Sequence, residues 1–160
     1  MDEKSLAIRK HPAHLPIDER FNRSNIVFVT VCTHQRKPFL ANALMQKHIV
    51  EAFNMAEHFM VGRYVIMPDH IHFFCAPNRH PPESLKKWLS FWKSQVTRRC
   101  DNTIPKPIWK REFWDRQLRS GESYSEKWAY VCQNPVRAAL VKSADEWPFQ
   151  RELNQLTWHD

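Results

Sequence analysis

Two histidines separated by one residue, in the segment VIMPDHIHFFC, are the clearest chemical signal in the sequence. The apolar residues around them are typical of a β-strand, and alternate side chains of a strand share a face. His70 and His72 therefore point the same way, and two imidazoles on one face can bind one divalent metal ion. Two alternatives remain: a pair of surface histidines on a half-exposed strand, or a structural zinc site that adds Cys75. Strand alternation places Cys75 on the opposite face, which counts against the zinc site.

A tyrosine and an asparagine four residues apart, in SEKWAYVCQNPVRAALV, form the second candidate pair. This spacing makes Tyr130 and Asn134 neighbours on a helix. A phenol can attack a phosphodiester once a nearby cation or base activates it, because its unperturbed pKa is about 10. The alternatives are that Tyr130 packs in the core and that Asn134, before Pro135, marks a helix break. Tyr124 is the second choice as nucleophile, and Tyr64 is expected to pack in the core.

Basic residues form the third group of candidates. The chain has 160 residues and a formal net charge of +7, which favours a polyanionic partner such as nucleic acid. The residues expected to contact DNA are Lys86, Lys87, Lys93, Arg98, Arg99, Arg111, Arg116 and Arg119. Trp109 or Trp114 can stack on an unpaired base, whereas Trp88 and Trp92 are expected in the core. The alternative is that this basic helix face is only solvated.

The elements that position these residues follow from hydrophobic periodicity and turn signals. Strands are predicted at residues 26–31, 61–67, 70–76 and 108–114, and helices at 44–58, 84–99 and 124–140. Ser84 is the predicted N-cap of the second helix, and Pro135 interrupts the third. The order predicts an α+β fold, with a ferredoxin-like antiparallel sheet, helices on one face, and a C-terminal helix that carries the tyrosine. The predicted organisation is an N-terminal arm (1–24), a catalytic domain (25–142) and a short C-terminal tail (143–160).

Composition argues against several classes of protein. The chain has only two glycines, which excludes a glycine-rich phosphate loop and argues against a nucleotide-hydrolysing motor. No apolar run approaches membrane-spanning length, so no membrane association is expected. The four cysteines form no CxxC pair, and the first residues contain no apolar stretch of a signal peptide. We therefore expect a cytoplasmic protein with reduced cysteines.

Taken together, these segments resemble the single-tyrosine HUH transposases of small insertion sequences, and more closely their REP-associated branch. The resemblance covers most of the chain, through FVTVCTHQRKPFL, MPDHIHFF, SLKKWLSFWKSQVTRR, IWKREFWDRQLRSGESY and AYVCQNPVRAALV. His70 and His72 fall on the family's histidine pair, and Tyr130 matches its catalytic tyrosine. Asn134 matches a third metal-ligand position. Cys132 and Gln133 depart from the pattern, because such sequences more often carry His or Tyr there.

The resemblance implies an activity. It is metal-dependent nicking and rejoining of single-stranded DNA through a 5′-phosphotyrosine intermediate, with Mg²⁺ or Mn²⁺ as cofactor. The implied partner is hairpin or palindromic repeat DNA, and the implied state is a monomer or a homodimer. Two alternatives stay open at this stage: a non-catalytic module that binds single-stranded nucleic acid, and a domesticated protein that binds repeats without transposing.

Overall fold

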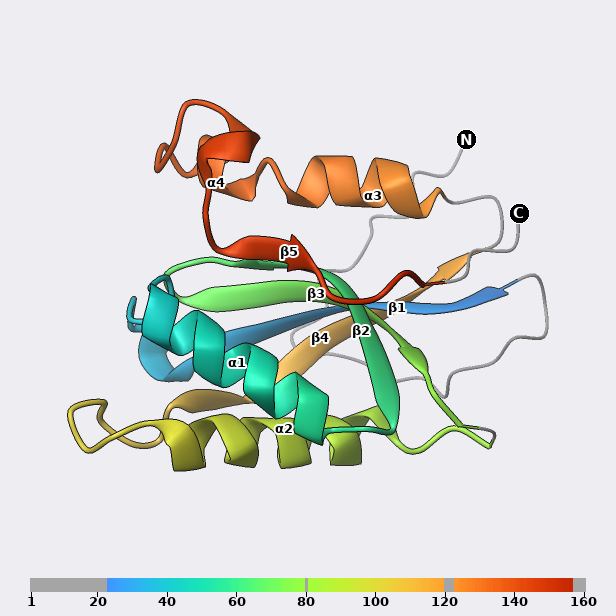
Figure 1. Ribbon diagram of the computed structural model, residues 1–160, viewed down its shortest axis with the longest axis horizontal. Helices are drawn as coiled ribbons and strands as arrows, with labels where there is room; N and C mark the ends of the chain where they lie inside the picture. The colour runs from blue at the N-terminus through green and yellow to red at the C-terminus, as the bar shows by residue number, and fades with distance from the viewer. Residues whose placement is uncertain (1–22, 80, 120–122, 157–160) are drawn as a thin grey trace, which may run out of the picture.

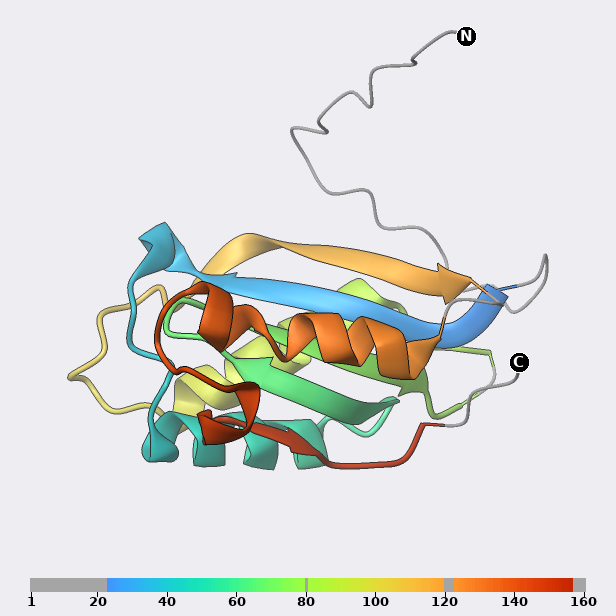
Figure 2. The ribbon, with the colours of Figure 1, turned by 90° about the horizontal axis from the view of Figure 1, so that it is seen from above.

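The computed structural model describes residues 23–79, 81–119 and 123–156, and these residues form a five-stranded antiparallel sheet with helices on both faces (Figures 1 and 2). The strand order is β4-β1-β3-β2-β5. The strands are β1 (Arg23–Thr33), β2 (Phe59–Ile66), β3 (His70–Pro77), β4 (Trp109–Arg119) and β5 (Gln150–Glu152). The helices are α1 (Ala43–Met55), α2 (Leu85–Arg99), α3 (Tyr124–Val131) and α4 (Asn134–Arg137), with 3-10 turns η1 (His34–Arg36) and η2 (Ala144–Glu146). The first four strands with α1 and α2 confirm the predicted α+β, ferredoxin-like arrangement. The predicted arm lies almost wholly outside the described residues.

Helices α1 and α2 cover one face of the sheet (Figure 1). The apolar side chains of α2 recur at helical spacing, and all of them are buried: Leu85, Trp88, Leu89, Trp92 and Val96. The predicted N-cap is confirmed, because the Ser84 hydroxyl accepts a hydrogen bond from the backbone N–H of Lys87 at 3.4 Å.

Helix α1 begins after Asn42, whose side chain accepts a hydrogen bond from the backbone N–H of Met45 at 2.9 Å. The helix ends at Met55, three residues before the predicted end, because Phe59 already belongs to β2. Leu44 is 58% exposed, whereas the next residue, Met45, packs in the core. The apolar spacing nevertheless located the helix, whose other buried residues include Ile49 and Phe53.

Side-chain alternation along the strands divides the apolar residues between the two faces. Val29 of β1 and Phe73 of β3 face α1 and α2, as does Cys75. Ile26 and Phe74 face the other way, where they form a second core cluster with residues of α3. Helix α3 therefore packs on the face opposite α1 and α2 (Figure 1).

Gly62 of β2 lies where the first residue of α3 approaches the sheet. The Tyr124 hydroxyl accepts a hydrogen bond from the backbone N–H of Arg63 at 3.0 Å. A Cβ at position 62 would lie 2.6 Å from that hydroxyl oxygen and 2.8 Å from the side chain of Leu156. Only glycine leaves room for this contact, which anchors α3 on the sheet.

The structure differs from the predicted elements mainly after residue 114. Strand β4 continues to Arg119, and the predicted last helix is divided into α3 and α4. The break falls at Cys132 and Gln133, so Pro135 lies inside α4 rather than at the interruption. Strand β5, which the sequence pattern did not indicate, pairs with β2. Across the described residues, no helix is both long enough and apolar enough to cross a membrane.

Candidate active site

His70 and His72 lie side by side on β3, on the face of the sheet that carries α3. Their ring centroids are 4.7 Å apart. Nδ1 of His70 lies 2.7 Å from a carboxylate oxygen of Asp69, and Nδ1 of His72 lies 2.7 Å from the hydroxyl of Thr30. Such partners fix the orientation of metal-binding imidazoles, and here they leave Nε2 of each ring for a ligand. The shared face predicted from the sequence is confirmed.

Asp69 is itself held by a residue of the turn after β1. Arg36 Nε donates to the second carboxylate oxygen of Asp69 at 2.9 Å, and Nη1 of Arg36 lies 2.8 Å from the Cys32 sulfur. Arg36 has φ 56° and Gln35 has φ 54°, a left-handed conformation that costs energy in residues other than glycine. The strained turn places the guanidinium beside the carboxylate that orients His70.

The electrostatic environment keeps both imidazoles neutral. Burial lowers the pKa of His72 to about 3, and the charges of His70, Arg137 and Arg36 act in the same direction. Burial also lowers the pKa of His70, against the opposing effect of Asp69. Burial tends to raise the pKa of Asp69, but the His70 hydrogen bond and the neighbouring charges outweigh it and hold that pKa low. Neutral imidazole is the form that binds a metal ion.

The low pKa of His72 predicts that the metal-free protein loses stability in acid. The unfolded chain protonates this residue near pH 6.5, while the folded chain keeps it neutral down to about pH 3. Between these values the unfolded state binds the extra proton, so the free energy of unfolding falls as the pH falls. We expect the wild type to lose on the order of 3–5 kcal/mol more than His72→Gln between pH 7 and pH 3. Urea unfolding of both proteins in EDTA measures this difference. If the free energy of unfolding depended on pH equally in both proteins, His72 would not be buried in its neutral form.

Tyr130 lies on the solvent side of α3 and is 68% exposed, so it is not the core residue of the alternative interpretation. The guanidinium carbon of Arg137 lies 4.2 Å from the centroid of its ring, a cation–π contact. Arg137 Nη2 also donates to the Tyr130 carbonyl at 3.0 Å and to the side-chain oxygen of Asn134 at 2.6 Å. Arg137 therefore connects the candidate nucleophile to the candidate third metal ligand.

The other two tyrosines are buried. The Tyr64 hydroxyl accepts a hydrogen bond from Gln46 at 2.8 Å, and this residue packs in the core as predicted. Burial raises the pKa of Tyr124 to about 12, which disfavours the phenolate that a nucleophile needs. Tyr130 is thus the tyrosine that a DNA phosphate can reach most readily.

Asn134 is the first residue of α4, and its side chain binds Arg137 rather than capping the helix. The charge of Arg137, which binds the Asn134 side chain, also lowers the pKa of His72. Cys75 is fully buried in the core on the opposite face, so it does not complete a zinc site with the histidines. Over residues 23–79, 81–119 and 123–156, no three His, Cys, Asp or Glu side chains gather as a metal site. Among the described residues, the amide oxygen of Asn134 is a candidate ligand of another type.

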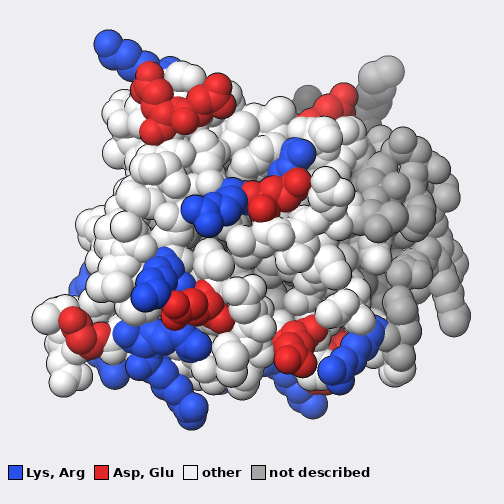
Figure 3. All heavy atoms as spheres, in the orientation of Figure 1, with Lys and Arg blue, Asp and Glu red and all other residues white. Residues whose placement is uncertain are grey.

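The predicted DNA-binding residues are divided between the two faces of the sheet. Arg116 lies on the histidine face, because it pairs with Phe28, whose ring stacks on His72 at 5.3 Å. Helix α2 lies on the other face and carries Lys86, Lys87, Lys93, Arg98 and Arg99. The structure therefore brings Arg116 near the histidines and places the residues of α2 away from them. On the side seen in Figure 3, Lys and Arg are interspersed with Asp and Glu.

Two of the predicted contacts on α2 are engaged within the protein. The Lys93 ammonium donates to the backbone carbonyls of Lys110 and Arg111 at 3.0 and 3.3 Å. Burial lowers the pKa of Lys93 to about 8. Arg99 forms an ion pair with Glu51 at 3.3 Å. Lys86, Lys87 and Arg98 are exposed, as are Arg111 and Arg119 of β4, so their phosphate-binding role stays a prediction.

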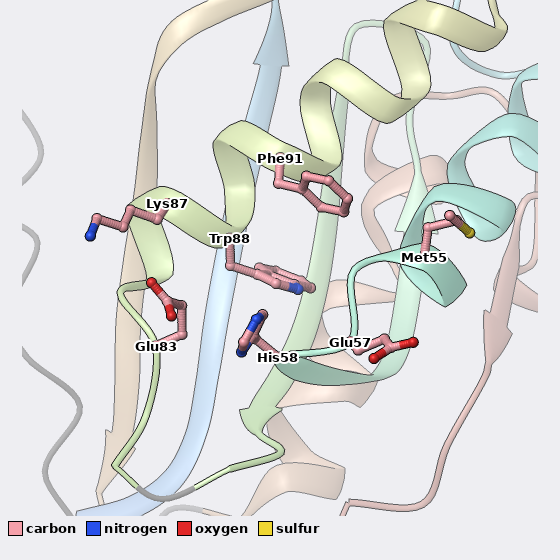
Figure 4. Close-up of a pocket in the computed structure, with 7 residues that line it drawn as sticks. All are labelled: Met55, Glu57, His58, Glu83, Lys87, Trp88 and Phe91. Atoms are coloured by element: carbon pink, nitrogen blue, oxygen red, sulfur yellow. The ribbon is translucent and has the colours of Figure 1, made fainter.

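A pocket of about 340 Å³ lies between the end of α1 and the start of α2 (Figure 4). Met55, His58, Trp88 and Phe91 are among the residues that line it. The sheet separates this pocket from the histidine pair. It is therefore not part of the candidate active site.

Comparison with known proteins agrees with this arrangement. Residues 22–133 match the family model described as "Transposase IS200 like". A REP-associated tyrosine transposase of Escherichia coli (strain K12) is 27% identical over 124 residues, which are 76% of this chain and 73% of that protein. A solved REP-associated tyrosine transposase bound to a REP hairpin shares the fold, with a TM-score of 0.64 and 22% identity over 80% of this chain and 76% of that one. Because the family match covers well over half of the sequence, this chain belongs to the IS200-like transposase family.

Proposed function

We propose that this protein nicks and rejoins single-stranded DNA at hairpin or palindromic repeats, with Tyr130 as the nucleophile. The observation that carries the proposal is an exposed tyrosine under an arginine guanidinium, on the sheet face that holds two neutral histidines. Membership of the transposase family supports the reaction class. The hairpin in the structure of a relative supports the class of substrate.

The proposed reaction exchanges one ester bond for another. The phenolic oxygen of Tyr130 attacks the scissile phosphorus, and its proton passes to a neighbouring base or to water. The bond from phosphorus to the 3′ oxygen breaks as the new bond forms, and the leaving oxygen becomes a 3′-OH. The downstream strand stays attached to the protein through its 5′-phosphate. Attack by the 3′-OH of another strand reverses these steps and frees Tyr130, so no nucleotide hydrolysis is needed.

The residues of this chain fit a divalent cation at the histidine pair. His70 and His72 would hold Mg²⁺ or Mn²⁺ through Nε2, since Asp69 and Thr30 engage Nδ1 of each ring. Asn134 would add its amide oxygen. Such a cation, when bound, would neutralise charge on the scissile phosphate. Arg137 adds a fixed positive charge beside Tyr130, and a guanidinium has several N–H donors for phosphate oxygens.

The polarity of the covalent adduct tests the proposal. The protein is incubated with Mn²⁺ and a library of single-stranded hairpins with randomised flanks, labelled either upstream or downstream of the cut. We expect a denaturant-resistant adduct that carries only the downstream label, and an upstream fragment with a 3′-OH that a polymerase extends. A nuclease that uses water would instead leave the 5′-phosphate free. Upstream label on the protein, or free ends on both fragments, would exclude the phosphotyrosine mechanism.

The same experiment separates the two alternative functions. A non-catalytic binding module would retain hairpins without any adduct. A domesticated protein would retain the same active site, so it would form the adduct on its repeat without completing strand transfer. Joining of a second strand to the adduct is therefore measured in the same reaction.

A further inference from the structure

We propose that Trp114 is the platform on which an unpaired DNA base stacks beside the scissile phosphate. This inference rests on the proposed function and specifies how the site selects single-stranded DNA. Trp114 lies on β4 and is 43% exposed. Its neighbour on the same strand, Trp109, is 8% exposed and lies 5.1 Å from the Trp92 ring in the core. Of the two tryptophans that the sequence offered for stacking, only Trp114 is accessible.

The sheet register places Trp114 in line with the histidine pair. Trp114 pairs with Thr30 of β1, and Thr30 pairs on its other side with His72 of β3. Residues directly opposite each other in antiparallel strands share a face, and their Cα atoms are about 4.5–5.5 Å apart. The Cα atoms of Trp114 and His72 are therefore roughly 10 Å apart across one row. An indole at this distance can contact a base close to a phosphate held at the histidines.

The surface around Trp114 suits a single strand. Arg116 follows on the same face of β4 and pairs with Phe28, whose ring stacks on His72. Aromatic rings beside basic side chains are the usual means of binding unpaired bases together with their phosphates. Helix α3 runs over β1 and β3 in Figure 2 and leaves β4 to one side. Trp114 is thus exposed at an edge strand that no other described strand or helix covers on this face.

Base stacking explains this exposure better than a packing role does. A tryptophan buries a large apolar area when it is in the core, as Trp88 and Trp92 do here. Because the Trp114 ring is partly exposed, part of the free energy of burying its apolar surface is not realised. A ligand with a flat aromatic face would bury that surface. Stacking is tolerant of sequence, because every base has such a face. Trp114 would therefore favour unpaired over paired DNA and leave sequence selection to other residues.

The chain offers a matched control for the test. Phe91 of α2 is 44% exposed, nearly the same as Trp114, but it lines the pocket on the other side of the sheet (Figure 4). Full-length Trp114→Ala, Trp114→Phe and Phe91→Ala are compared with the wild type by fluorescence anisotropy in EDTA. The probes are a hairpin selected by the wild-type protein, with its single-stranded flank and without it.

We expect Trp114→Ala to weaken binding of the flanked hairpin about 5- to 150-fold, the effect of one stacked base. Binding of the hairpin without its flank should change little. Trp114→Phe should retain most of the affinity, and Phe91→Ala should bind like the wild type. Equal losses on both probes, or loss in Phe91→Ala as large as in Trp114→Ala, would overturn the inference.

Abasic substitutions locate the base and guard against a folding artefact. Each flank base of the hairpin is replaced in turn by an abasic site. The wild type should lose affinity at one position near the cut, and Trp114→Ala should be insensitive at that position. Additive losses at every position would mean that Trp114 touches no base. If an adduct forms but the Trp114 and abasic effects are not coupled, the proposed chemistry holds and the role of Trp114 in stacking is wrong. If the effects are coupled but no adduct forms, Trp114 stacks on a base and the proposed chemistry is wrong.

Discussion

Tyr130→Phe is expected to abolish the covalent protein–DNA adduct while leaving hairpin binding nearly unchanged. The substitution removes the attacking oxygen, so the cleavage rate should fall by roughly three orders of magnitude or more. Tyr130 is 68% exposed, so loss of its hydroxyl should have little effect on folding. The ring that lies under Arg137 is retained, so the local cation–π contact also survives. Gel analysis of the adduct under denaturing conditions, with anisotropy for binding, measures both effects.

Tyr124→Phe is the matched control, because the same atom is removed from a buried tyrosine at the start of the same helix. Its hydroxyl accepts the backbone N–H of Arg63, which would be left without this partner. We expect Tyr124→Phe to form the adduct and to lose about 1–3 kcal/mol of unfolding free energy. An adduct that persists in Tyr130→Phe and disappears in Tyr124→Phe would reassign the nucleophile.

The histidine face could be predicted from the sequence because strand alternation is strictly local. His70 and His72 alternate with Ile71 and Phe73, and the structure separates the two sets onto opposite faces as expected. Helix α2 was located for a similar reason, since its buried residues recur at helical spacing. Such patterns specify which side of an element is buried.

Local patterns of apolar residues do not specify which face of the sheet a helix covers. The periodicity of α2 separates its apolar stripe from its lysines, but nothing in it places the helix opposite the histidines. Strand β4 was predicted too short for a related reason. Its last residues, from Asp115 to Arg119, are mostly polar, and pairing with β1 rather than alternation keeps them in the sheet. Strand β5 has three polar residues and depends wholly on its pairing with β2.

The arginines of the site were also missed, because their partners come from distant or irregular segments. Arg36 and Asp69 are 33 residues apart, and a left-handed turn brings them together. Arg137 carried a local signal, since it follows Asn134 by three residues and Tyr130 by seven on helical segments. The spacing places these residues near one another, but the contact of Arg137 with the Tyr130 ring depends on how α4 turns back after the break that follows α3.

Substitution of both histidines is expected to remove metal-dependent cleavage, and EDTA should stop the wild type. Each imidazole has Nδ1 in a hydrogen bond, which directs Nε2 toward a ligand, so His70→Ala and His72→Ala together delete both proposed ligand atoms on β3. The double variant should lose both the adduct and Mn²⁺ binding, measured by calorimetry in the absence of DNA. His58→Ala is the control, because this histidine lines the pocket on the far side of the sheet (Figure 4).

Two further variants test how the neighbouring residues contribute to metal binding at the same site. Asp69→Asn keeps the shape of the side chain that orients His70 but removes its charge. We expect it to weaken Mn²⁺ binding about 10- to 100-fold, as loss of an outer-shell partner does. Asn134→Ala should weaken it less, because the side-chain oxygen of Asn134 is shared with Arg137. If the wild type and the double histidine variant bind Mn²⁺ equally, the metal does not bind at β3. The positive charges of the site would then be those of Arg36 and Arg137.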